Sequence, residues 1–560
     1  MNETLGLVAL GGALPVAWYA LASAKTRLEL SLAKHRSLAG HPRMARRIAA
    51  LMPEYRYRED EAFGIDGAPA DIVARRRAAF TQLSEQFCTR FARSAALSAE
   101  AESGISDMRF VSAYRVPFQF RTLASQLKGG SFVQATRGVT VTDLDGNTFY
   151  DLTGSYGVNL FGNDFYKQCI ADGSALVGEL GPVLGAYHPV VADNVFRLKE
   201  ISGMDEVSFH MSGTEAVMQA VRLARYHTRR THLVRFCGAY HGWWGDVQPG
   251  IGNPVRARDT HTLKEMDEAT LRVLRRRRDI ACVLVNPLQA LHPNVNAPGD
   301  SSLVDSSRRA AYSREAYTRW LIQLRKICDE RGIALIFDEV FVGFRLAPGG
   351  AQEYFGVHAD LVTYGKTLGG GLPIGVVCGK HAWMKRFRDN APADICFARG
   401  TFNSHPYVMG AMNAFLRRLD TAPVRALYDG LEDIWNGRAR ALNQRLTEAG
   451  VPVQVANFST IWTVTYTQPA CYNWLFQHYL RLEGLALSWV GSGRLIFSLN
   501  YSAADFDAVA NRIVRAALAM QRDGWWWHNP ALTNNSIKRR LLREIAREFF
   551  SRKIVSRVPI

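Results

Sequence analysis

Short apolar runs alternate with helix-like segments between residues 196 and 420, and this alternation constrains the fold more than any other feature. Strands that alternate with helices usually pair in parallel, and they are apolar throughout because helices cover both faces of the sheet. The sequence therefore predicts an α/β fold whose large domain, residues 196–420, surrounds a mainly parallel sheet. The apolar runs are Leu233–Phe236, Ile280–Val285, Ala334–Phe337 and Ile374–Val377.

Weaker patterns on both sides of this domain indicate a second, smaller α/β lobe. Residues 139–150 alternate apolar and polar side chains around Gly146-Asn147, which is typical of a β-hairpin. The β-branched run Thr460–Thr467 and a helical pattern near Ala504–Met520 come much later. The predicted divisions are a helical N-terminal extension over 25–110, a linker with the first part of the small lobe over 111–195, and the rest of this lobe over 421–522.

The N-terminus contains a candidate membrane anchor within residues 1–24. Leu5–Ala24 has no charged residue, and a helix of that length spans about 30 Å, the thickness of a bilayer core. If it crosses a membrane, the basic residues after it place the N-terminus outside and the rest of the chain on the cytoplasmic face. The alternatives are a soluble cytoplasmic protein with a buried or dimer-contact helix, and a secretory signal, which the acidic Glu3 disfavours.

The C-terminal segment, residues 523–560, is rich in tryptophan and basic residues. Trp525-Trp526-Trp527 precedes a stretch whose apolar residues fall near one helical face, and aromatic and cationic side chains together suit a lipid headgroup region. This pattern predicts membrane association through both termini. A helix that packs on its own domain is the alternative. The apolar residues are Ile537, Leu541, Leu542, Ile545, Phe549 and Phe550.

Charge and cysteine placement argue against two other classes of protein. The formal net charge is +17, but residues 25–47 and 536–557 hold most of the excess, and the body between them is near neutral. No zinc-finger or RNA-binding spacing occurs, so we expect no nucleic-acid partner. The eight cysteines lie far apart without a C-x-x-C pair, which indicates free thiols in a reducing compartment rather than disulfides or a metal site.

Two segments of the large domain could hold an anionic, planar ligand. Ser212-Gly213-Thr214 opens a helical pattern, and a helix N-terminus presents free N–H groups to a phosphate, although a simple helix cap would look the same. Tyr240-His241 follows the predicted strand Leu233–Phe236, where an aromatic ring could stack on a cofactor.

Two further residues could supply the chemistry. Asp338 ends an apolar strand, and a buried aspartate can keep a pyridinium nitrogen protonated; a metal ligand or an ordinary strand end is the alternative. Lys366 lies among glycines after a short strand, where loss of solvation makes an amine nucleophilic, although a solvated loop lysine is the more common case. Their occurrence together with the other two segments favours one active site.

The combined motifs resemble the class-III pyridoxal-phosphate (PLP) aminotransferases, and most closely their glutamate-1-semialdehyde 2,1-aminomutase branch. The resemblance runs from about Phe132 to Gln521 and implies a fold-type-I PLP transferase. The matching segments are Phe209–Ala216, Gly238–Gly242, Phe337–Arg345, Gly349–Gly356 and Gly365–Gly371.

The resemblance assigns a role to each residue of the predicted site. Lys366 would bind PLP as a Schiff base and move the proton, and Asp338 would pair with the ring nitrogen. Thr401 would reach the phosphate of the neighbouring subunit, which implies a homodimer with shared active sites. The other expected cofactor contacts are Ser212, Gly213 and Thr214 at the phosphate, Tyr240 and Val340 on the two ring faces, and His241.

Three departures from the family pattern bear on the substrate: Met211, Asn286 and His405 replace residues that are usual in the family. We therefore expect an aminotransferase that passes an amino group from a donor to an aldehyde or ketone on a hydrophobic, membrane-associated substrate. One alternative is an aminomutase acting on a small soluble semialdehyde, for which Arg345 and Arg494 are candidate carboxylate ligands. The other is a catalytically silent scaffold that retains the fold.

Overall fold

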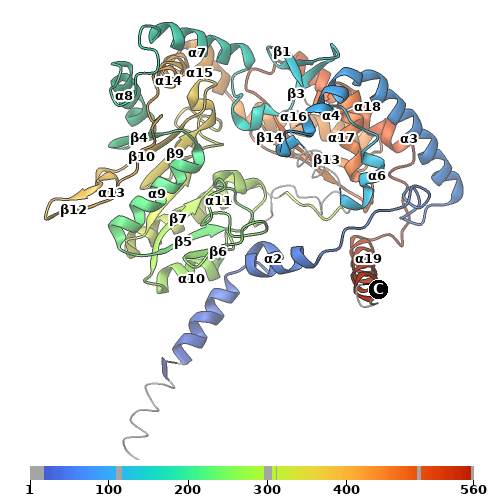
Figure 1. Cartoon of the computed structure of the whole chain (residues 1–560), viewed down its shortest axis with the longest axis horizontal. Coiled ribbons are helices and arrows are strands. Elements are labelled where there is room, and N and C mark those ends of the chain that lie inside the picture. Colours follow the sequence, from blue (N-terminus) through green and yellow to red (C-terminus); the bar gives the residue numbers. More distant parts are fainter. Residues whose placement is uncertain are drawn as a thin grey trace, which may run out of the picture.

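A seven-stranded sheet lies at the centre of the large domain in the computed structural model (Figure 1). Its strand order is β4-β10-β9-β8-β7-β5-β6, and β10 is antiparallel to both of its neighbours. The strands are β4 (Glu206–His210), β5 (His232–Phe236), β6 (Thr260–Leu263), β7 (Ile280–Val285), β8 (Ala334–Asp338), β9 (Leu361–Gly365) and β10 (Gly375–Gly379). The structure describes residues 18–19, 21–108, 117–130, 132–255, 257–294, 306–310, 312–487 and 493–555.

Helices cover both faces of this sheet. Cys282 and Leu284 of β7 pack with the apolar side of α9 (Gly213–Thr228), whereas the alternate residues Val283 and Val285 join the core cluster that includes α10 and α11. Successive side chains of a strand point to opposite faces, which explains why β7 is buried along its whole length. The other helices of the large domain and its flanks are α7 (Asn163–Leu176), α8 (Val190–Ser202), α10 (Glu268–Arg276), α11 (Arg314–Arg331), α12 (Gly350–Phe355), α13 (His381–Met384) and α14 (Pro406–Leu419).

The predicted α/β fold with a mainly parallel sheet is confirmed, and the four predicted strands of the large domain coincide closely with β5, β7, β8 and β10. Strands β4 and β6 were not predicted. They lie at the two edges of the sheet and carry polar residues such as Glu206 and Thr260, so they lack the continuous apolar run of an interior strand.

The direction of the strands brings the carboxyl ends of six strands to one edge of the sheet. β5, β6, β7, β8 and β9 are parallel, and β4 has the same direction because β10 is antiparallel to both β4 and β9. Their carboxyl ends therefore meet, which is where open α/β sheets bind ligands. The residues at or just after five of these ends are Ser212, Gly238–Gly242, Asn286, Asp338 and Lys366.

The smaller lobe combines two distant parts of the chain. β2 and β3 form the predicted hairpin, and β3 pairs in parallel with β15. A second sheet has the order β13-β14-β16. The strands are β1 (Val133–Arg137), β2 (Thr140–Asp143), β3 (Thr148–Asp151), β13 (Val453–Phe458), β14 (Ile461–Tyr466), β15 (Leu485–Ala486) and β16 (Arg494–Ile496). The helices are α15 (Ala422–Arg425), α16 (Leu431–Glu448), α17 (Phe476–Leu482) and α18 (Ala503–Arg522). A separate hairpin is formed by β11 (Phe387–Arg388) and β12 (Ala391–Ile395).

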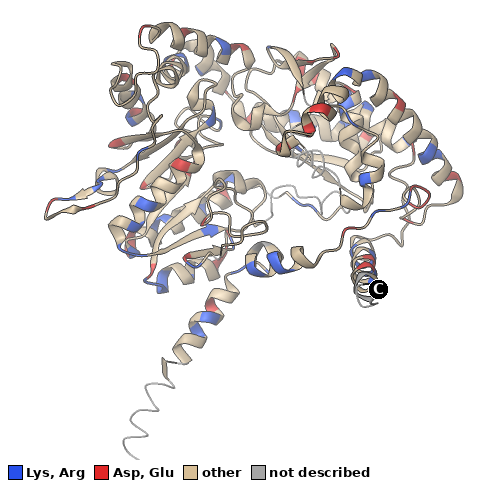
Figure 2. Cartoon of the chain, in the orientation of Figure 1, with Lys and Arg blue, Asp and Glu red and all other residues tan. Residues whose placement is uncertain are grey.

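The N-terminal extension is helical, and its helices α3 (Ala70–Arg90) and α4 (Ala92–Glu102) pack on the smaller lobe and the C-terminal segment. Helix α2 (Pro42–Leu51) precedes them, and α6 (Arg121–Ala124) follows the extension. Arg76 of α3 is fully buried, forms a two-pronged ion pair with Asp66, and also donates to the carbonyl oxygen of Gly524 at 2.8 Å. In Figure 2, lysine and arginine positions are coloured along the helix of residues 21–32, α2, α10 and α19 (Asn534–Val555).

The prediction that the tryptophans of the C-terminal segment meet a membrane is wrong. Trp525 and Trp526 are 0 and 4% exposed, and their indole N–H groups donate to Tyr479 and Asn473. The helix α19 that follows also packs through Ile537, while Glu544 accepts hydrogen bonds from two tyrosines of the N-terminal extension. The alternative, a helix packed on its own protein, therefore describes this segment.

No helix within the described part of the chain is long and apolar enough to cross a membrane. The predicted anchor Leu5–Ala24 lies mostly outside that part, which begins at residue 18 and omits residue 20.

We expect Arg76→Met to destabilise the fold strongly. Removing one partner of a buried ion pair costs about 3–5 kcal/mol, because the carboxylate of Asp66 stays buried without its cation. Chemical denaturation followed by circular dichroism measures this loss. Arg75→Met, at an exposed neighbouring position, is the matched control, and equal midpoints for the two variants would contradict the expectation.

Candidate active site

Lys366 begins a tight turn directly after β9, in a half-buried position. Its backbone φ is +50°, a conformation that non-glycine residues adopt rarely. The amine donates to the carbonyl oxygen of Tyr156 at 2.7 Å and lies 4.2 Å from the centre of the Phe341 ring. The pKa of Lys366 is lowered to about 7, chiefly by burial and to a smaller extent by Arg345 and Arg494, while the charge of Asp338 opposes the shift. A substantial fraction of this amine is therefore neutral at pH 7.

Asp338 ends β8 beside Lys366 and is buried. One carboxylate oxygen accepts a hydrogen bond from Nδ1 of His241 at 2.7 Å, and the other accepts from the hydroxyl of Thr363 at 3.3 Å. Burial lowers the pKa of His241, although Asp338 opposes this, so the imidazole is mainly neutral. Among the described residues, no lysine or arginine lies within ion-pair distance of this carboxylate.

The N-terminus of α9 lies next to the turn that carries Tyr240. Ser212 caps the helix by accepting from the N–H of Glu215 at 3.2 Å, and the first N–H groups of a helix have no partner inside it. A Cβ atom on Gly242 would lie 2.3 Å from the Thr214 hydroxyl, and one on Gly213 would lie 2.6 Å from Val340. Only glycine allows these close approaches, which leave the positive end of α9 open to an anion.

Tyr240 is exposed on the monomer and belongs to the turn after β5. The side-chain amide of Asn286 donates to the Tyr240 carbonyl oxygen at 2.8 Å and so holds the turn at the sheet edge. Asn286 was noted only as a departure from the family pattern, and the hydrogen bond gives it a structural role.

Thr401 and its neighbours form an exposed apolar strip. Thr401 is exposed, and Phe397 and Phe402 beside it are more than half exposed. The structure describes one subunit, and within it Thr401 contributes no hydrogen bond to the phosphate-binding end of α9.

The two candidate carboxylate ligands differ in their surroundings. Arg345 is fully buried and donates to the Thr460 hydroxyl at 2.8 Å and to the Phe497 carbonyl oxygen at 2.7 Å, so it joins the two lobes. Arg494 begins β16 and is close enough to Lys366 to lower its pKa. Within the described chain the guanidinium of Arg494 has no hydrogen-bond acceptor and no acidic partner, and its Nε atom is buried.

The sequence did not identify the role of Tyr156. Ser155 and Tyr156 both have left-handed backbone conformations, with φ of 44° and 58°, and this turn presents the carbonyl oxygen that Lys366 contacts. Left-handed non-glycine residues are uncommon and gather at functional sites. Two successive residues with left-handed backbone angles give no repeating pattern of residue types, so a single sequence does not reveal them.

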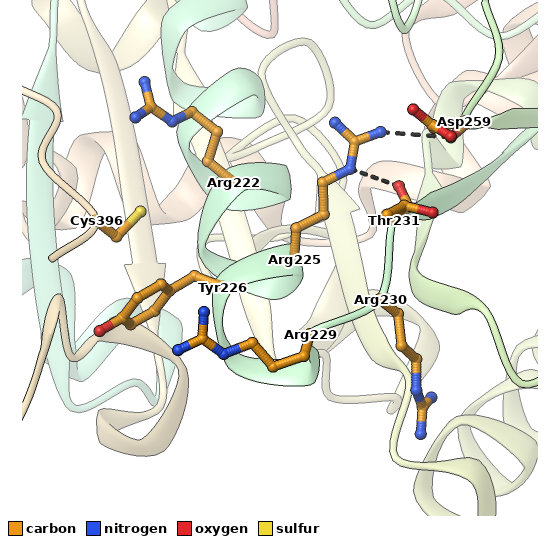
Figure 3. A pocket seen from close by; sticks show the side chains of 8 residues that line it. All are labelled: Arg222, Arg225, Tyr226, Arg229, Arg230, Thr231, Asp259 and Cys396. Atoms are coloured by element: carbon orange, nitrogen blue, oxygen red, sulfur yellow. Dashed lines mark hydrogen bonds between the residues drawn. The ribbon is translucent and has the colours of Figure 1, made fainter. Parts of the chain in front are cut away.

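A pocket at the far end of α9 is separate from this site (Figure 3). It has a volume of about 420 Å³. Since an α-helix rises roughly 1.5 Å per residue, the length of α9 places this pocket about 20 Å from Gly213. Its arginines are bound to internal acceptors: Arg225 to Asp246 at 2.7 Å and Arg222 to the Phe397 carbonyl oxygen at 2.9 Å. The lining residues are Arg222, Arg225, Tyr226, Arg229, Arg230, Thr231, Asp259 and Cys396.

The residues at the sheet edge fit PLP. The carboxylate of Asp338 is buried without a cationic side chain in contact, and a protonated ring nitrogen would supply the missing charge. The open end of α9 suits a phosphate, and the amine of Lys366 suits the aldehyde. This fold and site together define a PLP-dependent transferase of fold type I.

Comparisons with known proteins identify the family. Residues 124–247 and 310–517 match the family model described as aminotransferase class-III, so the chain belongs to the class-III aminotransferases and is a PLP-dependent enzyme. A glutamate-1-semialdehyde 2,1-aminomutase of Nitratidesulfovibrio vulgaris (strain DP4) is 35% identical over 341 residues, which are 60% of this chain and 77% of the relative.

Two solved structures are similar. One, described as a transaminase with PLP bound, is 27% identical and aligns with a TM-score of 0.62 over 77% of this chain and 99% of its own. A glutamate-1-semialdehyde aminomutase from Pseudomonas aeruginosa PAO1 shares the fold, with a TM-score of 0.64 and 19% identity over 80% of this chain and 99% of its own.

The lowered pKa of Lys366 predicts how the apoenzyme captures PLP. The neutral amine attacks the aldehyde, so the capture rate should rise about tenfold between pH 6 and pH 8 and then level off, as expected for a pKa near 7. Stopped-flow absorbance measures this rate. In Asp338→Asn the midpoint should move to lower pH, because Asp338 raises this pKa. A rate that keeps rising to pH 10 would contradict the expectation.

Proposed function

We propose that the enzyme exchanges the amino and carbonyl groups of a small, carboxylate-bearing semialdehyde, as an aminomutase does. Its curated relatives include proteins named glutamate-1-semialdehyde 2,1-aminomutase, and these favour the aminomutase alternative over transfer to a hydrophobic, membrane-associated carbonyl compound. Arg494 carries the proposal, because a partly buried guanidinium near Lys366 without an acceptor is suited to a substrate carboxylate.

Each residue of the site has a task in this reaction. PLP supplies an electron sink for the bond that breaks at the substrate carbon. Lys366, with its lowered pKa, exists in both protonation states near pH 7 and could therefore move a proton between a substrate carbon and a cofactor carbon. Asp338 keeps the ring nitrogen protonated, and His241 holds the Asp338 carboxylate in place.

A second candidate is transfer between two molecules, from an amino donor to a separate aldehyde or ketone. Met211, Asn286 and His405 depart from the family pattern, and Asn286 fixes the Tyr240 turn that borders the site. These differences favour a substrate other than glutamate-1-semialdehyde itself.

We also propose a homodimer in which Thr401 completes the phosphate site of the partner. The exposed Phe397 and Phe402 beside Thr401 supply apolar area for such an interface. A holoenzyme that sediments with twice the subunit mass would support the dimer, and an active monomer would contradict it.

Incubation with glutamate-1-semialdehyde and no other amine tests the reaction type. An aminomutase should move the amino group from carbon 2 to carbon 1 under these conditions, and chromatography detects the product. If turnover requires an added amino donor, the second candidate is correct. If no amine or amino acid changes the absorption spectrum of the holoenzyme, the chain is a scaffold.

The role of Arg494 can be measured separately. We expect Arg494→Met to lower kcat/KM for substrates that carry a carboxylate by about 10- to 100-fold, the usual effect of losing a hydrogen bond between charged groups. Amines without a carboxylate should be unaffected. Arg515→Met, an exposed position of the same lobe, is the control, and an equal loss on both substrate types would argue against a carboxylate contact.

A further inference from the structure

Exposed apolar side chains form two stripes near the N-terminal end of the described chain. Leu28 and Leu32 lie on one face of the helix formed by residues 21–32 and are 61 and 56% exposed. In α2, Met44, Ile48 and Leu51 recur at helical spacing and are also exposed. Single exposed apolar residues are normal, but two successive helices with an uncovered apolar face indicate a contact surface.

The C-terminal end of the first helix and one side of α2 are fixed to the large domain. Ala33 is buried, and its carbonyl oxygen accepts a hydrogen bond from the Lys264 N–H at 2.8 Å. The Arg46 side chain donates to the carbonyl oxygen of Asn253 at 2.6 Å. Glu29 forms an ion pair with Arg276 of α10. The exposed apolar side chains are therefore uncovered although the segment is attached to the large domain. Figure 1 shows the first helix projecting from the body of the protein.

Lysine and arginine residues lie on both helices (Figure 2). Residues 18–52 contain seven lysines and arginines, and the single acidic residue, Glu29, is already paired. A second copy of this chain would bring like charges face to face, whereas an anionic surface would be attracted. The exposed cations that form no ion pair with any described residue are Lys25, Arg27, Arg36, Arg43 and Arg47.

We propose that residues 21–52 dock the enzyme on an anionic lipid bilayer. The two helices lie along the membrane surface, their leucine, methionine and isoleucine side chains enter the boundary of the acyl chains, and their lysines and arginines contact lipid phosphates. This mode of binding needs no membrane-spanning helix, and it does not depend on the amino-transfer reaction.

Vesicle flotation of the full-length holoenzyme tests the docking surface. Binding to phosphatidylcholine vesicles that contain about a third phosphatidylglycerol should exceed binding to phosphatidylcholine alone by about a hundredfold, since each basic residue near the surface contributes several-fold. Raising sodium chloride from about 0.05 to about 0.5 M should remove most of this preference. Hydrogen exchange of residues 21–52 should slow when anionic vesicles are added.

Two variants assign the effect to these helices. Ile48→Asp should weaken vesicle binding at least about tenfold, because a charge replaces an inserted apolar side chain. Leu97→Asp on α4 is the control, with 39% exposure against 37% for Ile48. The double variant Arg43→Gln, Arg47→Gln should lose most of the anionic preference. All three should retain PLP absorbance and activity.

Three results would overturn the proposal. Equal vesicle binding by Ile48→Asp and Leu97→Asp would place the contact elsewhere in the chain. Equal binding to neutral and anionic vesicles would remove the role of the cations. Self-association that Ile48→Asp abolishes, without any vesicle binding, would identify a second copy of the chain as the occupant of the surface.

Discussion

The buried carboxylate of Asp338 is the constraint on which the active site depends. A charge in that position is costly unless a cation or several donors compensate it, and here a mainly neutral histidine, a threonine hydroxyl and the Val340 N–H donate to the carboxylate but no described lysine or arginine pairs with it. A protonated ring nitrogen of PLP would supply the missing cation. The same charge acts on Lys366, whose lowered pKa is the balance between burial and nearby arginines on one side and Asp338 on the other.

The sheet explains how residues so far apart in the sequence reach this carboxylate. Because the strands are parallel, every second loop lies at the same edge of the sheet. β10 is the one antiparallel strand, and its place between β9 and β4 gives β4 the same direction as the others, so the N-terminus of α9 lies at that edge as well. The close approaches of Gly213 to Val340 and of Gly242 to Thr214 then set the spacing between the phosphate end and the ring end of the site. A larger residue at either position would push the two ends apart.

The sequence predicted the parts of the molecule that depend on local patterns. Interior strands such as β7 were recognisable because both of their faces are apolar, and Lys366 and Asp338 were recognisable because each follows such a strand. Edge strands β4 and β6 lacked this signal. The tryptophans at 525 and 526 were assigned to a membrane because composition cannot tell a headgroup region from a core, and only the partners Tyr479 and Asn473 settle their position. The Tyr156 turn depends on backbone angles that a single sequence does not reveal.

The contacts of the N-terminal extension have a consequence for biosynthesis. Arg76 donates to the carbonyl oxygen of Gly524, 448 residues further along the chain, and Tyr55 and Tyr57 donate to Glu544, so the extension finds these partners only after the catalytic body has been translated. Domains usually fold in the order of synthesis. This extension instead has to wait, and its aromatic side chains stay uncovered during translation of the whole catalytic body, a period in which a chaperone would find them accessible.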